Sequence, residues 1–183
     1  LSLRTNGYEW HKRLAAGEIS WTSPEARAVF AEFAKLQPYV TANHAAIDWQ
    51  DAAAIFVQGR AANYVMGNFA VAVFREGGMT NENLGFMVFP EITPGIPRAE
   101  EAPTDTVHLT SGAQNPEDAK LLLAYMASAE AQTKWNAALG QLPTNRNATV
   151  DPSDPVLTEG FQGLSTAEGG MAQLGDGDAA AED

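Results

Sequence analysis

The chain has 183 residues, of which 45 % are apolar and 19 % are charged, so it can bury a core and is not expected to be disordered as a whole. Its 11 basic and 23 acidic residues give a formal charge of −12, which disfavours binding to phosphate backbones or anionic lipid. It has no cysteine, which excludes disulfides, thiolate metal ligands and a cysteine nucleophile. No apolar stretch approaches the ~18 residues of a membrane span, and no signal-peptide pattern opens the chain.

The two ends of the chain differ in character. The sequence opens on Leu1 rather than Met, so it reads as a processed piece or an excised fragment. Residues 151–183 carry eight carboxylates and no Lys or Arg, which leaves a charge of −4 for residues 1–150. Gly and Ala dominate the last residues and cannot offset the chain entropy by burial. We therefore predict one main domain over 1–150 and an acidic, partly loose Gly/Ala-rich tail over 151–183.

Three helices are predicted from capping residues and from the helical spacing of apolar side chains. They cover residues 24–36, 49–58 and 116–139. Asp48 is the expected N-cap of the second helix, and Gly140 is the expected end of the third.

Strand-like apolar runs lie between these helices, at residues 61–66, 84–89 and 106–110. A short helix is expected directly after the first run. Alternating helices and strands predict an α/β fold in which the helices pack over a small mixed sheet.

Patterns for catalysis and metal binding are weak. His11, His44 and His108 have no metal-ligand spacing, and no Gly-x-Ser-x-Gly motif is present. The acidic residues 176–178 lack the remainder of a calcium loop, and the glycine pairs lack the lysine of a phosphate-binding loop. We expect no enzyme, no metal and no cofactor.

Aromatic and amide residues follow the end of a predicted strand. Asn68 and Phe69 come directly after the run at 61–66, and ligands of α/β sheets gather at the carboxyl ends of strands. An aromatic ring can stack on a sugar while an amide or carboxylate bonds its hydroxyls. Phe69 and Asn68 together therefore predict a sugar contact, whereas composition alone favours a core position for Phe69.

Other residues have two interpretations or a structural one. Asp105 could accept hydrogen bonds from two hydroxyls, or cap a turn, which propensity slightly favours. Trp49 could be a stacking platform or a core residue, and the core is favoured. Trp10 and Trp135 are predicted to be core residues because apolar neighbours lie at helical spacing. His108 is predicted to be a structural histidine.

Four segments, taken in order, resemble the extracytoplasmic solute-binding proteins of sugar ABC transporters, the maltose-binding-protein-like group. The most specific is FVQGRAANYVMGNF at residues 56–69, which is similar to the family's F-x-x-G-K-A-A-M-x-x-x-G-x-W. The segments at 85–90, 111–119 and 139–144 resemble G-x-x-x-x-P, S-K-N-P-E-E-A and G-x-L-P. Residues 3–10 also resemble a segment of this group.

The chain departs from the family pattern in two residues and in extent. Asn63 stands where Met is usual, and Phe69 stands where Trp is commoner. The family's N-terminal lobe and closing C-terminal helices have no counterpart. The resemblance therefore implies the C-terminal lobe of a two-lobed periplasmic-binding-protein (type II) fold, whose lobes close on a ligand by a hinge.

The resemblance also implies a function. It is the carbohydrate-binding lobe of an ABC-transporter substrate-binding protein, which captures a neutral sugar or polyol in the periplasm or another extracytoplasmic space and delivers it to a membrane permease. The implied partners are the sugar, the missing N-terminal lobe and the ABC permease, without nucleic acid. The expected ligand-binding residues are Phe69, Asn68, Asp105, Trp49 and Arg4. The alternative is an isolated or engineered lobe that acts as a protein interaction scaffold without binding small molecules.

Overall fold

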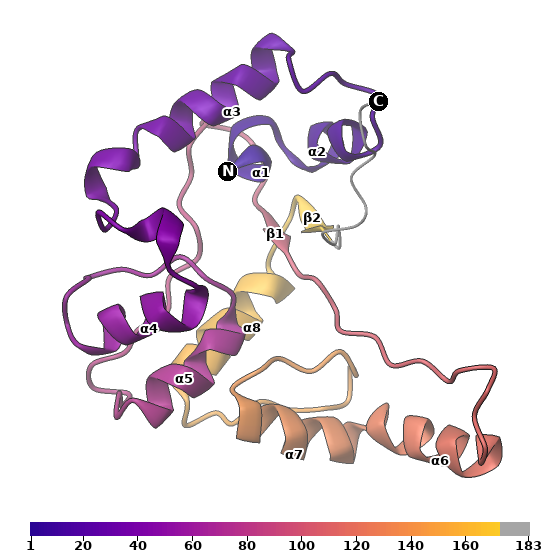
Figure 1. The fold of residues 1–183 in the computed structure, drawn as a ribbon. Helices are drawn as coiled ribbons and strands as arrows, with labels where there is room; N and C mark the ends of the chain where they lie inside the picture. Colours follow the sequence, from indigo (N-terminus) through magenta and orange to yellow (C-terminus); the bar gives the residue numbers. More distant parts are fainter. Residues whose placement is uncertain (173–183) are drawn as a thin grey trace. The chain divides into compact units, whose positions relative to one another are not determined.

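The computed structural model describes residues 1–172 and consists mainly of helices (Figure 1). The α-helices are α1 (Ser2–Asn6), α2 (Tyr8–Ala15), α3 (Pro24–Ala34), α4 (Trp49–Val57), α5 (Val71–Glu76), α6 (Pro116–Met126), α7 (Ala129–Leu139) and α8 (Pro155–Ser165). The 3-10 helices are η1 (Gln37–Tyr39), η2 (His44–Ala46) and η3 (Asn68–Ala70). None of the helices in this part of the chain is long and apolar enough to cross a membrane.

The chain divides into two compact units, each assembled from separated stretches of sequence. Unit 1 contains Leu1–His44, Val88–Thr104 and the described residues from Gln162 onward, and unit 2 contains Ala45–Met87 and Asp105–Phe161. The acidic range 151–183 includes α8 and a short strand. The remainder of the expected tail, residues 173–183, lies outside the described residues.

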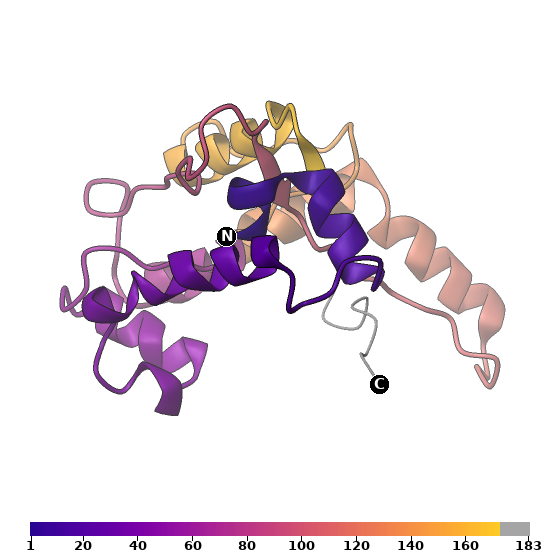
Figure 2. The same ribbon diagram turned by 90° about the horizontal axis from the view of Figure 1, so that it is seen from above.

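The sheet of the described chain is one pair of parallel strands in unit 1. β1 (Ala99–Glu101) pairs with β2 (Gly170–Ala172), and the two strands lie side by side in both views (Figures 1 and 2). Gly169 extends this contact, because its N–H donates to the Arg98 carbonyl at 2.7 Å.

The strands predicted at 61–66, 84–89 and 106–110 are wrong, because these residues join no ladder. β-propensity describes how well side chains suit a pleated surface, but it does not say which other segment will form the neighbouring strand. A strand exists only where backbone groups pair with a neighbouring strand. The expected mixed sheet is therefore absent from residues 1–172.

Two of the predicted helices begin at their capping residues. At the start of α3 the Ser23 hydroxyl accepts a hydrogen bond from the Ala26 N–H at 3.2 Å. At the start of α4 the Asp48 carboxylate accepts one from the Asp51 N–H at 2.8 Å. Each cap satisfies a backbone donor that the first helical turn leaves unpaired.

The helix predicted over 116–139 is two helices. α7 begins after Ser128, whose hydroxyl accepts a hydrogen bond from the Ala131 N–H at 3.2 Å, and serine favours such a cap over helix continuation. α7 ends at Gly140 as predicted, with a left-handed φ of +66°. A Cβ on Gly140 would lie 3.1 Å from Val71 Cβ, so the end of α7 lies against the start of α5.

Unit 2 holds the larger apolar core. Its buried residues come from α4, η3, α5, α8 and the loop after α5, and they are Ala53, Ala70, Val71, Phe74, Leu84 and Val156. The rings of Phe56, Tyr64 and Phe74 pack around one another, with centroid distances of 5.0, 5.9 and 6.2 Å. This aromatic cluster ties α4 to α5 and to the segment between them.

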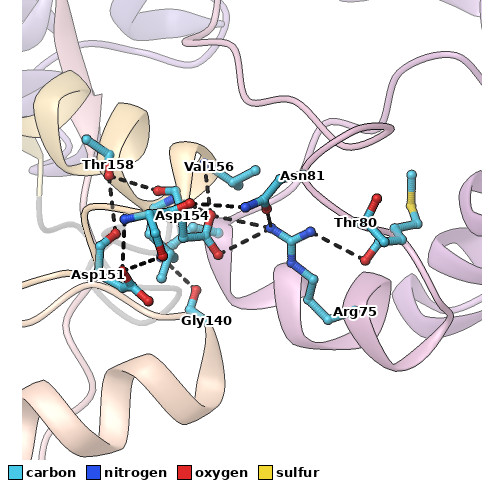
Figure 3. Close-up of polar contacts among 12 residues, drawn as sticks. Arg75, Thr80, Asn81, Gly140, Asp151, Asp154, Val156 and Thr158 are labelled. Atoms are coloured by element: carbon cyan, nitrogen blue, oxygen red, sulfur yellow. Dashed lines mark hydrogen bonds and ion pairs between the residues drawn. The ribbon is translucent and has the colours of Figure 1, made fainter.

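A polar network joins the start of α8 to α5 (Figure 3). The Arg75 guanidinium donates to the two carboxylate oxygens of Asp154 at 3.2 and 3.4 Å, and also to Asn81. The same carboxylate accepts hydrogen bonds from the N–H groups of Val156 and Leu157. Asp154 therefore caps the helix and pairs with α5 through one side chain.

Candidate functional site

Two aromatic side chains of unit 2 form the accessible part of the candidate site. Phe69 lies in η3 and is 41 % exposed, and Trp49 opens α4 and is half-buried against the core. The ring centroids are 5.3 Å apart and the planes meet at 88°. Such an edge-to-face pair is favourable, and it leaves the Phe69 ring within reach of a ligand.

The segment before η3 holds both rings in place. An ideal Cβ on Gly67 would lie 2.6 Å from Phe69 Cε1, so the ring rests directly on the Gly67 backbone. The Tyr64 hydroxyl donates to the Trp49 carbonyl oxygen at 2.7 Å. Burial, and then the nearby Asp48 carboxylate, raise the pKa of Tyr64, so this hydroxyl stays protonated and keeps donating.

Asn68 lies next to Phe69 and is half-buried. Its amide nitrogen donates a long hydrogen bond of 3.4 Å to the Gly140 carbonyl at the end of α7. Its amide oxygen has no hydrogen-bond partner among the described residues. The structure thus pairs Phe69 with Trp49, and the adjacent residue Asn68 keeps one amide acceptor without a partner among the described residues.

Asp105 stands on the irregular segment that leads to α6, and it is exposed. Within the described residues its carboxylate has no hydrogen bond and no ion pair. The strand that was expected to fix its position is absent. The structure therefore does not join Asp105 to Phe69 or Trp49.

Arg4 belongs to unit 1 and is only 5 % exposed. Its guanidinium donates to the carbonyl oxygens of Phe89 at 2.9 Å and Ala99 at 2.6 Å, and to the Glu100 carboxylate at 2.6 Å. Arg98 pairs with the same carboxylate at 3.2 Å. All three guanidinium nitrogens of Arg4 are thus bonded to protein groups, and these bonds hold α1 to β1.

Each histidine has one hydrogen-bond partner within residues 1–172. A ring nitrogen lies 2.8 Å from a hydroxyl of Ser2 for His11 and 2.8 Å from a hydroxyl of Thr106 for His108. Burial is the main cause that lowers the pKa of His11. In the described part of the chain no three His, Cys, Asp or Glu side chains gather where they could hold a metal ion.

The remaining tryptophans and the two surface hollows involve other residues than the aromatic pair. Trp135 is 60 % exposed, so its predicted core position is wrong, because nothing in the described chain covers that side of α7. Two hollows of about 530 and about 210 Å³ lie in unit 1, and both are lined by Trp21 and Phe30. Neither is lined by Trp49 or Phe69, so the candidate site is an aromatic surface and not one of these hollows.

Gly67 and Tyr64 were missed as contributors to the site. Both lie inside the segment at 56–69 that the sequence singles out. A glycine two residues before an aromatic ring was the available signal for close packing of that ring on the backbone. No signal in the sequence could have paired the Tyr64 hydroxyl with the Trp49 carbonyl.

Comparison with known proteins agrees with the resemblance. The family model described as bacterial extracellular solute-binding protein matches residues 1–133. An uncharacterised ABC transporter extracellular-binding protein of Pyrococcus horikoshii is 31 % identical over 162 residues, which cover 88 % of this chain and 36 % of that protein.

A solved structure shares the fold. It is the bacterial solute receptor AcbH, described as having an exclusive substrate preference for β-D-galactopyranose. The TM-score is 0.76 at 26 % sequence identity, and the match covers 93 % of this chain and 44 % of that receptor. The chain thus spans less than half the length of either relative. It belongs to the family of bacterial extracellular solute-binding proteins.

Proposed function

We propose that this chain is a carbohydrate-binding part of an ABC-transporter substrate-binding protein, which captures a neutral sugar outside the cytoplasm and delivers it to a membrane permease. The observation that carries this proposal is the accessible Phe69 ring, which meets Trp49 edge-to-face and follows Asn68 in the sequence. A ring of this kind stacks on the apolar face of a sugar, and the amide bonds a hydroxyl. The galactose preference in the description of AcbH supports a monosaccharide as the ligand.

The chain is proposed to act as one lobe, the C-terminal one. It corresponds to 44 % of the solved receptor, and its aromatic pair offers one wall for a ligand. An N-terminal lobe would supply the opposite wall, and the two would close on the sugar. We propose binding and release without chemistry on the ligand.

The proposed site residues have different roles. Phe69 is the stacking platform, Trp49 supports its ring, and Asn68 and Asp105 accept hydrogen bonds from sugar hydroxyls. Arg4 has its guanidinium bonded to protein groups, so we assign it a positioning role through β1.

Saturation-transfer NMR and calorimetry on the 183-residue chain test the proposal. With β-D-galactopyranose, D-glucose and maltose as probes, one wall of a site should bind in the millimolar range, which is about −4 kcal/mol. Phe69→Ala should weaken this binding, and that of an intact two-lobed protein, by about 1–3 kcal/mol. Tyr39→Ala is the matched control, because Tyr39 is an 87 % exposed aromatic residue of unit 1. Absence of binding to every probe, or equal binding by both variants, would overturn the proposal.

A graded series at Asp105 tests the acceptor role. Ionic hydrogen bonds contribute about 1.5–3 kcal/mol, so Asp105→Ala should weaken sugar binding more than Asp105→Asn does. The melting temperature should stay unchanged in both variants, because the carboxylate has no partner among the described residues. A lower melting temperature in Asp105→Ala, with affinity unchanged, would make Asp105 a turn cap instead.

A further inference from the structure

The junction between α1 and α2 contains an asparagine that is followed by a glycine. Asn6 is the last residue of α1, and Gly7 connects it to α2. The sequence has no second Asn-Gly pair. The backbone nitrogen that follows an asparagine can attack the side-chain carbonyl carbon, and glycine hinders this attack least because it has no Cβ. At this junction the side chain can therefore react with its own backbone.

The Gly7 nitrogen has no hydrogen bond to give up before it reacts. Among the described residues its N–H donates to no acceptor. By contrast, the N–H that follows α2, on Ala16, donates to the Lys12 carbonyl at 2.9 Å. Gly7 also has a φ of +86°, which glycine adopts without strain. The nitrogen that would attack is therefore free of competing bonds.

The Asn6 side chain is held by one weak bond. Its amide nitrogen donates to the Glu25 carbonyl of α3 at 3.4 Å, a length at which hydrogen bonds are weak. Its amide oxygen has no partner in the part of the chain that the structure describes. α1 is only five residues long, so its last residue can leave the helical conformation at low cost. Asn6 can then turn its Cγ carbon toward the Gly7 nitrogen.

We propose that Asn6 deamidates spontaneously and becomes a mixture of aspartate and isoaspartate. The Gly7 nitrogen loses its proton to hydroxide and bonds to the Asn6 Cγ carbon, while the side-chain nitrogen takes up a proton from water and leaves as ammonia. The product is a cyclic succinimide. Water then opens this ring. Cleavage of the bond from nitrogen to Cγ gives aspartate, and cleavage of the bond from nitrogen to the main-chain carbonyl carbon gives isoaspartate.

The products change how α1 is held within unit 1. A carboxylate has no N–H to donate, so both products lose the bond to the Glu25 carbonyl. Isoaspartate also lengthens the main chain between α1 and α2 by one carbon. α1 carries Arg4, which donates to the Ala99 carbonyl of β1 at 2.6 Å. We therefore expect the isoaspartyl form to hold α1 less firmly.

Asn147 provides a control in the same molecule. It is exposed, whereas Asn6 is half-buried, and its side-chain amide has no hydrogen bond within residues 1–172. The next residue, Ala148, has a Cβ, and its N–H donates to the Asn145 carbonyl at 3.0 Å. Exposure alone would make Asn147 react faster, whereas the following backbone nitrogen favours reaction at Asn6.

Ageing of the 183-residue chain tests the proposal. The chain is incubated at mildly alkaline pH, because hydroxide starts the reaction, and is then digested with pepsin in acid, where ring closure is slow. Peptide mass spectrometry follows the mass gain that replacement of NH2 by OH causes at each asparagine. The rate at Asn6 should exceed the rate at Asn147 by at least about tenfold, because the Gly7 nitrogen is unhindered and unbonded.

The product at residue 6 shows whether the ring forms. Isoaspartyl methyltransferase should methylate the aged peptide that contains residue 6, and Asn6→Gln should abolish this signal because its longer side chain closes the ring poorly. A rate at Asn6 equal to or below that at Asn147 would overturn the proposal. Conversion to aspartate without isoaspartate would also overturn it, because direct hydrolysis by water would then be the route.

Hydrogen exchange tests the effect on α1. The isoaspartyl form is isolated from the aged chain by chromatography, and Asn6→Asp is the matched control, because it loses the donor to Glu25 but keeps the length of the main chain. The amides of α1 should exchange at least about threefold faster in the isoaspartyl form than in Asn6→Asp. Equal exchange in the two forms would overturn the expected loosening of α1.

Discussion

Helices α5 and α6 both belong to unit 2, and their surroundings are opposite. α5 is only six residues long, yet it buries Val71 and Phe74. α6 is 11 residues long and carries more large apolar side chains, yet none of them is buried. Apolar content therefore does not decide which helix joins the core of this chain.

Whether a helix of this chain joins the core depends on where its packing partners lie. α5 is covered by α4 and η3, which precede it closely in the sequence, and by Val156 of α8. Among the described elements α6 packs chiefly against α7, and none of its residues is buried. Burial stabilises a helix in proportion to the apolar area removed from water, so α5 contributes more to the stability of this chain than α6 does.

Matched truncations give the largest expected effect. Phe74→Ala should lower the free energy of unfolding by about 3–5 kcal/mol, because it removes a buried ring and leaves a cavity. Leu121→Ala should change it by less than about 0.5 kcal/mol, because the side chain is 70 % exposed. Urea unfolding of both variants measures the difference. Similar losses would show that α6 is part of the core and that the contrast between the two helices is false.

Two arginines extend the comparison to charged side chains. Arg4→Met should cost about 3 kcal/mol of unfolding free energy, because it breaks a buried ion pair and leaves backbone acceptors unbonded. Arg13→Met, which removes an exposed pair with Glu18 at 3.3 Å, should cost less than about 0.5 kcal/mol. Urea unfolding measures both. If both variants lose the same small amount of unfolding free energy, the bonds of Arg4 are not structural, and the ligand-contact role predicted from the sequence stands.

Two glycines sharpen the comparison at the candidate site. Gly67→Ala should cost about 1–3 kcal/mol of stability and weaken sugar binding, because the new methyl group meets the Phe69 ring. Its φ of −66° adds no backbone strain. Gly85→Ala is the control, since no atom lies within 4 Å of a Cβ there. Unfolding and calorimetry should separate the two variants, and identical results would mean that the Phe69 ring is free to move.

The local parts of the fold could be predicted from the sequence. The cap at Asp48 and the stop at Gly140 were correct, because each depends on bonds within a few residues. The strands at 61–66, 84–89 and 106–110 were wrong, because a ladder depends on distant partners that propensity does not specify. Ser128 was read as helix interior, although its hydroxyl caps a new helix.

In the candidate site, too, contacts between sequence neighbours could be predicted, whereas contacts between distant residues could not. Phe69 and Asn68 are neighbours in the sequence, so their proximity followed from the segment that contains them. The contact of Trp49 with Phe69 brings α4 to η3 and required the packing of unit 2. The burial of Arg4 depends on a β1 partner far along the chain, which no local pattern could indicate.

The smallest expected effect is the pH dependence from His11. Burial lowers its pKa in the folded chain below the ordinary 6.5, so on acidification the unfolded chain takes up the proton first. The stability from the neutral ring is complete above about pH 6.5 and is lost as the pH falls through the lower folded pKa. Between about pH 7.5 and about pH 5.5, the melting temperature should fall more in the unmodified chain than in His11→Gln. Parallel curves of melting temperature against pH for the two proteins would contradict the lowered pKa of His11.

The pairing of β1 with β2 has a consequence for the order of events on the ribosome. Between these strands the chain passes through α6, α7 and α8, so unit 1 needs residues that are translated after all three helices. All of unit 2 has been translated once Phe161 is made, and its core can close while β2 is still missing. The stretch Leu1–His44 is therefore translated before unit 2 but can complete its packing only after unit 2. Until β2 is translated, β1 has no strand partner, so the β1 residues that bond Arg4 are not yet held in a sheet. A nascent chain that stalls before Gly170 would therefore leave unit 1 incompletely folded and accessible to chaperones and proteases.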